Sequence, residues 1–181
     1  MIQLQSKRLI IRQVENRDIP AIISFYSINS VFLKSYEPKR KDSFYTSEFW
    51  KNRLFEEKNS GTIRFFLFKN DEPDKIIGTV SISSIIRGAF HAGYIGYALS
   101  ESEQGSGYMT EALNAVISFA FCELNLHRLM ANCMTSNDRS LKLLSNIGFE
   151  VEGKAKKYLL INGNWEDHVF TSLVNKNWID E

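Results

Sequence analysis

The chain reads Gln104-Gly105-Ser106-Gly107-Tyr108-Met109-Thr110-Glu111-Ala112 just past its middle. A strand-like run at residues 94–99 precedes this stretch, and a strongly helical run at residues 111–124 follows it. Two glycines before a helix let the backbone turn its N–H groups outward with no side chains in the way. The helix start adds unpaired donors and about half a positive charge. We therefore predict a phosphate-binding loop here.

Two common phosphate motifs do not fit these residues. A P-loop needs Lys and then Ser or Thr after its last glycine, where this chain has Tyr108 and Met109. A dinucleotide fingerprint needs a small residue at the position of Thr110, and an acidic residue about 20 residues further on. Residues 127–129 are His-Arg-Leu instead. A two-glycine loop by itself can also be an ordinary turn, so the surrounding sequence has to decide between a turn and a site for another phosphate compound.

A second helix start lies downstream of the loop. Asn137-Asp138-Arg139-Ser140 opens a helix at residues 141–147, and Gly148 is typical of the position after a helix end. The order is strand, glycine loop, helix, strand, polar cap, short helix, strand. This order resembles the acetyl-coenzyme A (acetyl-CoA) binding core of the GNAT acetyltransferase superfamily.

The resemblance implies a fold for the whole chain. We expect one α/β (α+β) domain over residues 1–181, with a central mixed, mostly antiparallel twisted sheet. The sheet should have about seven strands, splayed between the fourth and fifth, and about four flanking helices. In the family the acyl-pantetheine inserts into the splay, beside the strand at residues 90–99. Gly93 and Gly96 in this strand favour a bulge or a close approach of a ligand.

The resemblance also implies which residues bind acetyl-CoA. In the family a Q/R-x-x-G-x-G/A loop holds the pyrophosphate, and an N-x-x-S helix start lies beside the pantetheine and thioester. Met109 departs from that pattern, because it stands where glycine or alanine is usual. The implied coenzyme-binding residues are Ile95, Tyr97, Ala98, Leu99, Gln104, Gly105, Ser106, Gly107, Tyr108, Met109, Asn137, Ser140 and Leu144.

Further segments resemble a narrower family, the RimJ-type ribosomal-protein-alanine N-acetyltransferases. They are residues 36–38, 86–92, 127–132, 158–163 and 165–169. The resemblance implies direct transfer of acetyl to a protein α-amine, typically the N-terminal alanine of a small-subunit ribosomal protein. It implies no metal, and contact with the ribosome or its assembly intermediates as a monomer or homodimer. Two alternatives stay open: an enzyme for small amines (antibiotic, polyamine or amino acid), and a non-catalytic ribosome-binding protein.

Composition limits the remaining classes. A chain of 181 residues with 44% hydrophobic content suits one domain with a proper core. A net charge of +1 gives no general case for DNA binding. No run reaches the roughly 18 apolar residues of a membrane span. Cys122 and Cys133 suit reduced core thiols, and the three histidines have no metal-ligand spacing. We expect a cytoplasmic protein.

The other elements follow from periodicity and turn residues. Residues 1–12 predict a first strand, and Asp18 a cap for a helix to about residue 27 with Pro20 in its first turn. We also predict a helix at residues 46–59 and two strands, at 63–69 and 75–86, joined by a turn at 70–74. A further strand is predicted at 127–135, and a hairpin is predicted to pair residues 149–161 with 165–174.

Acetyl transfer needs a neutral amine, a polarised thioester carbonyl and a proton for the leaving thiolate. Holding an α-amine neutral at pH 7 costs only about 1.4 kcal/mol, against about 4.6 kcal/mol for lysine. An N-terminal transferase can therefore work with a modest base. A backbone N–H near Tyr97 or Ala98 should polarise the carbonyl.

For Asn137 and Ser140, helix capping by Asn137 or its neighbour Ser136 competes with a role in proton transfer. The family position that donates to the coenzyme sulfur corresponds to Ser140. Glutamates that serve as base in some relatives are replaced here, at Tyr94 and near Tyr158. The candidates for base or amine ligand are Glu37, His91, Asp167 and His168. We expect catalytic roles for Ser140, Glu37 and His91, and substrate contacts from Glu37, Tyr94, Tyr158 and Asp167.

Overall fold

The computed structural model of the chain describes residues 1–180, with the side chain of Lys58 left aside. Within these residues, eight strands form one sheet in the order β1-β2-β3-β4-β5-β6-β8-β7. Neighbouring strands are antiparallel, except that β5 and β6 are parallel. The strands are β1 Gln3–Gln5, β2 Leu9–Arg12, β3 Ile63–Lys69, β4 Glu72–Ile86, β5 Ala92–Leu99, β6 Arg128–Met134, β7 Glu150–Ile161 and β8 Asn164–Val174.

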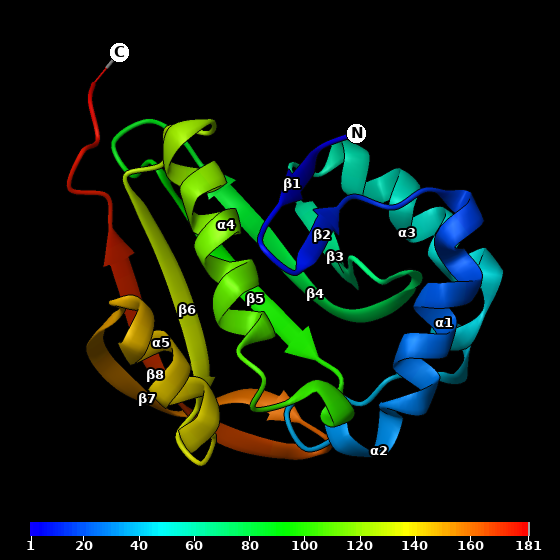
Figure 1. Ribbon diagram of the computed structural model, residues 1–181. Coiled ribbons are helices and arrows are strands. Elements are labelled where there is room, and N and C mark those ends of the chain that lie inside the picture. Colours follow the sequence, from blue (N-terminus) through cyan, green and yellow to red (C-terminus); the bar gives the residue numbers. More distant parts are fainter. Residues whose placement is uncertain (181) are drawn as a thin grey trace.

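Helices cover both faces of this sheet. They are α1 Ile19–Ile28, α2 Ser30–Leu33, α3 Ser47–Asn59, α4 Tyr108–Cys122 and α5 Asp138–Ile147. In Figure 1, α4 lies across β4 and β5, while α1 and α3 gather beside β1–β3. Successive side chains of β3 point to opposite faces of the sheet, which explains both layers. Phe65 and Leu67 pack in the hydrophobic cluster under α4. Phe66 and Phe68 pack in the cluster with α1 and α3. A sheet covered on both faces needs such a continuous apolar strand.

The central helix α4 forms for the reasons that its sequence indicates. Met109, Leu113, Val116 and Ala120 recur at helical spacing and are all buried. Gly107 caps the helix with φ +79°, a conformation that L side chains rarely adopt. The helix therefore begins at Tyr108, three residues earlier than the periodicity predicts.

The predicted splay in the sheet is present. In the described chain, β5 and β6 pair through Ala92 with Arg128, Gly93 with Leu129 and Tyr94 with Met130. Beyond these pairs the strands separate, so the backbone of residues 95–99 has no sheet partner on the β6 side. The interior glycine Gly93 is explained by packing, because an added Cβ would lie 3.1 Å from Cγ2 of Ile82.

Four details of the prediction were wrong. Residues 1–12 form two strands, because the chain turns between them where the N–H of Ser6 donates a hydrogen bond to the carbonyl of Leu9. The turn before β4 is shorter, since β4 already begins at Glu72. The carboxylate of Asp18 does not cap α1, because it binds Arg12 and the N–H of Glu15. Cys122 is exposed, whereas Cys133 is buried.

The C-terminal half ends in a long hairpin. The turn between β7 and β8 falls at Asn162 and Gly163, as predicted, and both residues have positive φ. In Figure 1 this hairpin extends beneath β5 toward α2. Over residues 1–180, no helix combines the length and apolarity needed to cross a bilayer.

Candidate active site

A cavity of ≈ 300 Å³ opens where β5 and β6 separate. Its wall on the α4 and α5 side includes Gln104, Met109, Asn137, Ser140 and Leu143. Its wall on the other side includes Phe32, Leu33, Tyr36, Glu37, Leu159, Ile161 and His168. Residues from both faces of the sheet therefore line one cavity.

The predicted phosphate loop lies at the α4 end of this cavity. Gly105 and Gly107 both adopt left-handed φ values, +77° and +79°. Within the described residues, no backbone N–H from Gly105 to Thr110 donates to a protein acceptor. These donors lie in an exposed loop at a helix N-terminus, beside the guanidinium of Arg8. The loop therefore has the donor set that a pyrophosphate needs.

Arg8, which the sequence analysis missed, braces the loop. Its Nη1 donates to the carbonyl of Ser106 (2.9 Å), its Nε pairs with Glu111 (2.8 Å), and its guanidinium lies 4.4 Å from the ring centre of Tyr108. Burial raises the pKa of Glu111, but hydrogen bonds from Ser6 and Arg8 outweigh it and hold that pKa below its usual value. Arg8 thus fixes the loop and adds positive charge beside it.

Gln104 and Met109 line the cavity and also stabilise the structure around the loop. The Nε2 of Gln104 donates to the carbonyls of Leu99 (3.1 Å) and Ser100 (3.3 Å), which ties the end of β5 to the loop. The side chain of Met109 is 6% exposed and packs in the core under α4. Its bulk therefore points away from the loop, and its N–H stays available.

The start of α5 joins β5 through a pair of hydroxyls. Asn137 caps the helix by accepting from the N–H of Ser140 (3.1 Å). The Oγ of Ser140 lies 2.5 Å from the hydroxyl of Tyr97. Burial raises the pKa of Tyr97 well above its usual value, against a smaller opposing effect of Ser140. Burial likewise raises the pKa of Cys133, so Tyr97 and Cys133 are protonated near neutral pH.

The edge of β5 supplies the middle of the cavity. Ile95, Tyr97, Ala98 and Leu99, which we predicted to bind the coenzyme, all line it. Leu144 does not, because it is 1% exposed in the core. Its neighbour Leu143, about 100° further round the helix, takes the place in the cavity wall.

The cavity wall that includes Glu37 (the acceptor side) contains only some of the residues predicted to act as base or to contact the amine substrate. Glu37 lines the cavity and pairs with Arg40, whose guanidinium lies 3.9 Å from the ring centre of Phe44. Tyr158 is exposed and is not part of the cavity wall, and its ring centre lies 5.6 Å from that of His168. Asn132, also missed by the sequence analysis, lines the cavity with a buried Oδ1 that has no hydrogen-bond partner in the described chain.

Three further residues that were predicted to act in catalysis or substrate binding lie outside the cavity wall. Asp167 is exposed, and its Oδ1 accepts from the N–H of Lys157 (2.8 Å). Tyr94 belongs to the paired part of β5. His91 precedes β5 at the opposite end from the cavity, with its ring centre 5.3 Å from that of Trp178. The structure therefore gives Asp167 and His91 structural contacts and no place in the cavity.

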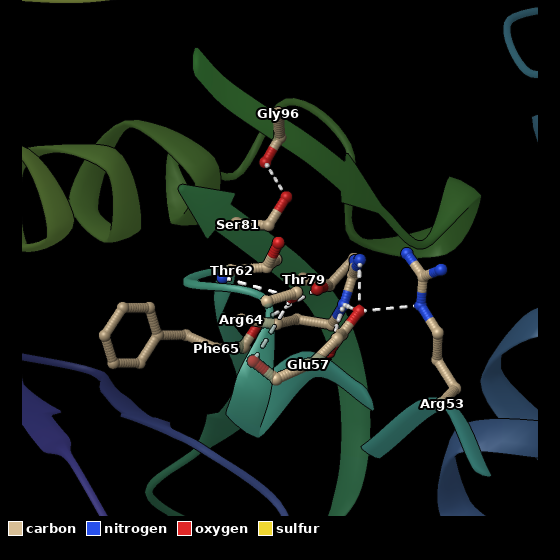
Figure 2. A network of polar contacts seen from close by, with 9 residues as sticks. Arg53, Glu57, Thr62, Arg64, Phe65, Thr79, Ser81 and Gly96 are labelled. Atoms are coloured by element: carbon tan, nitrogen blue, oxygen red, sulfur yellow. Dashed lines mark hydrogen bonds and ion pairs between the residues drawn. The ribbon is translucent and has the colours of Figure 1, made fainter. Parts of the chain in front are cut away.

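A polar network on the acceptor face holds α3 to the sheet (Figure 2). Glu57 accepts from Arg53 (2.8 Å) and Arg64 (3.0 Å), and is 8% exposed. On the neighbouring strands, Ser81 donates to the carbonyl of Gly96 (3.5 Å). Since two arginines already bind the Glu57 carboxylate, this buried acid stabilises the fold and is no free base. In residues 1–180, no cluster of three His, Cys, Asp or Glu side chains could hold a metal ion.

Comparisons with known proteins point to the same chemistry. The acetyltransferase (GNAT) domain family matches residues 8–150. The chain is 42% identical to a [ribosomal protein uS5]-alanine N-acetyltransferase of Escherichia coli (strain K12), over 98% of this chain and 93% of that protein. It is 38% identical to a probable N-acetyltransferase of Bacillus subtilis (strain 168), over 95% and 97%. The crystal structure of a ribosomal-protein-S5-alanine acetyltransferase from Vibrio fischeri superposes with a TM-score of 0.93 at 40% identity, covering 99% and 100%.

Proposed function

The chain belongs to the GNAT acetyltransferase family, and we propose that it transfers acetyl from acetyl-CoA to the N-terminal alanine of ribosomal protein uS5. One observation carries this proposal: the 42% identity to the Escherichia coli enzyme over 98% of the chain. That span includes the acceptor-side elements α1, α2, β7 and β8 as well as the coenzyme core. The similarity therefore bears on the acceptor as well as on the coenzyme.

The residues at the α4 end fit acetyl-CoA, which supplies a thioester as the activated acetyl group when it is bound. The free N–H groups of residues 105–110 would hold the pyrophosphate oxygens, with Arg8 beside them. The unpaired backbone of residues 95–99 would bind the pantetheine amides as an added strand does. A backbone N–H near Tyr97 or Ala98 would polarise the thioester carbonyl.

Tyr97 and Ser140 would provide the proton for the departing sulfur. Both hydroxyls line the cavity, 2.5 Å apart. The raised pKa of Tyr97 keeps its proton in place near neutral pH. Ser140 donates to the sulfur and is resupplied by Tyr97, so the pair acts as one relay.

The acceptor enters from the opposite side, between α2 and the β7–β8 hairpin. Glu37 lines this entrance and pairs with Arg40, which holds its carboxylate in place to attract an ammonium group. Because coenzyme and acceptor reach the cavity from different faces, the amine attacks directly in a ternary complex. Such a site suits an α-amine, which needs only about 1.4 kcal/mol to be neutral at pH 7.

The proposed substrate also suggests where the enzyme works. A ribosomal protein is made and assembled in the cytoplasm, so we propose a cytoplasmic enzyme. It meets its substrate as a free protein or within a ribosome assembly intermediate.

A panel of acceptors tests this function. Thiol release from acetyl-CoA would be measured with peptides that begin with the residues of uS5, and with the same peptides beginning with Ser or Met. An N-blocked lysine peptide and a set of small amines, including polyamines, serve as controls. We expect kcat/KM to be highest for the free N-terminal alanine. Turnover confined to small amines would contradict the proposed acceptor, and no turnover with any amine would indicate a non-catalytic protein.

A further inference from the structure

His168 on β8 is a buried histidine in the wall of the cavity. It is 4% exposed and lies opposite Met134 of β6 in the sheet. Its ring shares the cavity with Ser140 and Tyr97, but stands on the acceptor side with Leu159 and Ile161. This is the side from which the proposed α-amine arrives.

The hydrogen bond of the His168 ring shows which ring nitrogen carries the proton in the neutral imidazole. The Nδ1 of His168 lies 3.0 Å from the backbone carbonyl oxygen of Glu166. A carbonyl oxygen can only accept, so Nδ1 donates, and the neutral ring carries its lone pair on Nε2. In the described chain Nε2 has no hydrogen-bond partner. Tyr158 packs edge-on against the ring and holds it in place.

The other ionisable groups that line the cavity are less suited to take a proton. Tyr97 and Cys133 have pKa values raised by burial, so both keep their protons near neutral pH. Arg139 carries only N–H donors, and Tyr36 contributes a phenolic hydroxyl. The carboxylate of Glu37 is paired with Arg40. Among the cavity residues, His168 alone offers a basic imidazole nitrogen, and its Nε2 lone pair has no partner in the described chain.

We propose that His168 is the general base that deprotonates the acceptor's α-ammonium group. This inference rests on the proposed function and adds the residue that starts the reaction. One N–H bond of the ammonium breaks, and its proton goes to Nε2. The neutral amine then forms a C–N bond to the acetyl carbon as the C–S bond breaks. The second amine proton replaces the one that Ser140 and Tyr97 give to sulfur, and His168 later returns its own proton to water.

The variant His168→Asn separates this role from a structural one. The amide nitrogen of asparagine can replace Nδ1 as donor to the Glu166 carbonyl, while the Nε2 base is lost. General bases contribute about 10²–10⁴-fold, so kcat/KM for an Ala peptide should fall at least about 100-fold near pH 7. The loss should shrink to about tenfold or less near pH 9, because an α-amine with a pKa near 8 is then mostly neutral.

Three controls accompany this test. Acetyl-CoA affinity by calorimetry should be unchanged in His168→Asn. His127→Asn, at the paired end of β6 and outside the cavity wall, should retain full activity. His168→Gln replaces the ring by another neutral amide and serves if the asparagine variant does not fold. An unchanged kcat/KM, or a loss that is equal near pH 7 and pH 9, would overturn the proposal.

The same assays distinguish failure of this inference from failure of the proposed function. If the wild-type enzyme acetylates no α-amine, the function is wrong, and this role for His168 is wrong with it. If the wild-type enzyme acetylates the Ala peptide and His168→Asn does so equally well, the function stands and His168 is not the base.

Discussion

The hydroxyls of Tyr97 and Ser140 lie 2.5 Å apart and connect β5 to the first turn of α5 across the splay in the sheet. The two residues are 43 positions apart in the chain. The pair lines the cavity where coenzyme and acceptor meet. If the pair is a proton relay, both hydroxyls matter to turnover and neither matters much to coenzyme affinity.

We predict that Ser140→Ala and Tyr97→Phe each lower kcat by about 10–100-fold, within the usual range for lost acid catalysis. The double variant should lose little more than the worse single variant, because either change interrupts the same relay. Steady-state kinetics gives kcat, and calorimetry should show near-normal acetyl-CoA affinity. Independent, multiplicative losses would argue against a relay, and unchanged turnover in Ser140→Ala would remove that residue from the mechanism.

The phosphate loop depends on the backbone shape at Gly107. We predict that Gly107→Val abolishes detectable acetyl-CoA binding, because valine resists φ +79° and its methyl groups cover the N–H donors. Gly88→Val is a matched control, since Gly88 has φ +68° in an exposed loop outside the cavity. The control should lose stability from the same strain but bind the coenzyme. Normal binding by a folded Gly107→Val protein would refute the loop assignment.

Glu111 makes the brace around the loop sensitive to pH. Its pKa is lowered in the folded protein, so its stabilising effect is present above the ordinary value of 4.5 and is lost as pH falls through the folded value. Glu111→Gln should therefore cost about 1–3 kcal/mol at neutral pH. Urea unfolding at decreasing pH should show this difference shrinking below pH 4.5. A difference that stays constant with pH would show that charge is not its source.

Glu57 gives a test of the fold on the acceptor face. Glu57→Ala leaves Arg64 buried without its partner, and losing one member of a buried ion pair costs about 3–5 kcal/mol. Chemical denaturation should show this loss, together with weakened anchoring of α3. The exposed pair of Arg17 with Glu15 offers a comparison, and Arg17→Ala should change stability little. Equal effects of the two substitutions would contradict a structural role for the Glu57 network.

Local features of the sequence predicted the elements well. Strand β3 has the predicted limits, and α5 ends at Gly148 in the left-handed conformation that the glycine indicates. Propensity, capping and turn residues act over a few positions, so they can be read from one segment. The loop that we propose for phosphate binding could be predicted for the same reason, since its glycines and the following helix are contiguous.

The rest of the site depends on contacts between distant segments. Arg8 and Glu111 form an ion pair although they are 103 positions apart, and no local sequence pattern predicts such a pair. Helical spacing does not say which of two adjacent leucines faces the core and which faces the cavity, yet Leu144 is buried in the core and Leu143 lines the cavity. The sequence does not show which of His91 and His168 lies at the cavity. This is decided by the direction of β5 and by the pairing of β8 with β6.

The most direct measurement is tandem mass spectrometry of intact uS5 after incubation with the enzyme and isotopically labelled acetyl-CoA. The account predicts one acetyl group per chain, located on the α-amine of the N-terminal alanine, and none on any lysine. It also predicts no labelling of uS5 that begins with an already acetylated alanine. Label on lysine side chains, or an unlabelled free N-terminus beside efficient acetylation of small amines, would contradict the central claim.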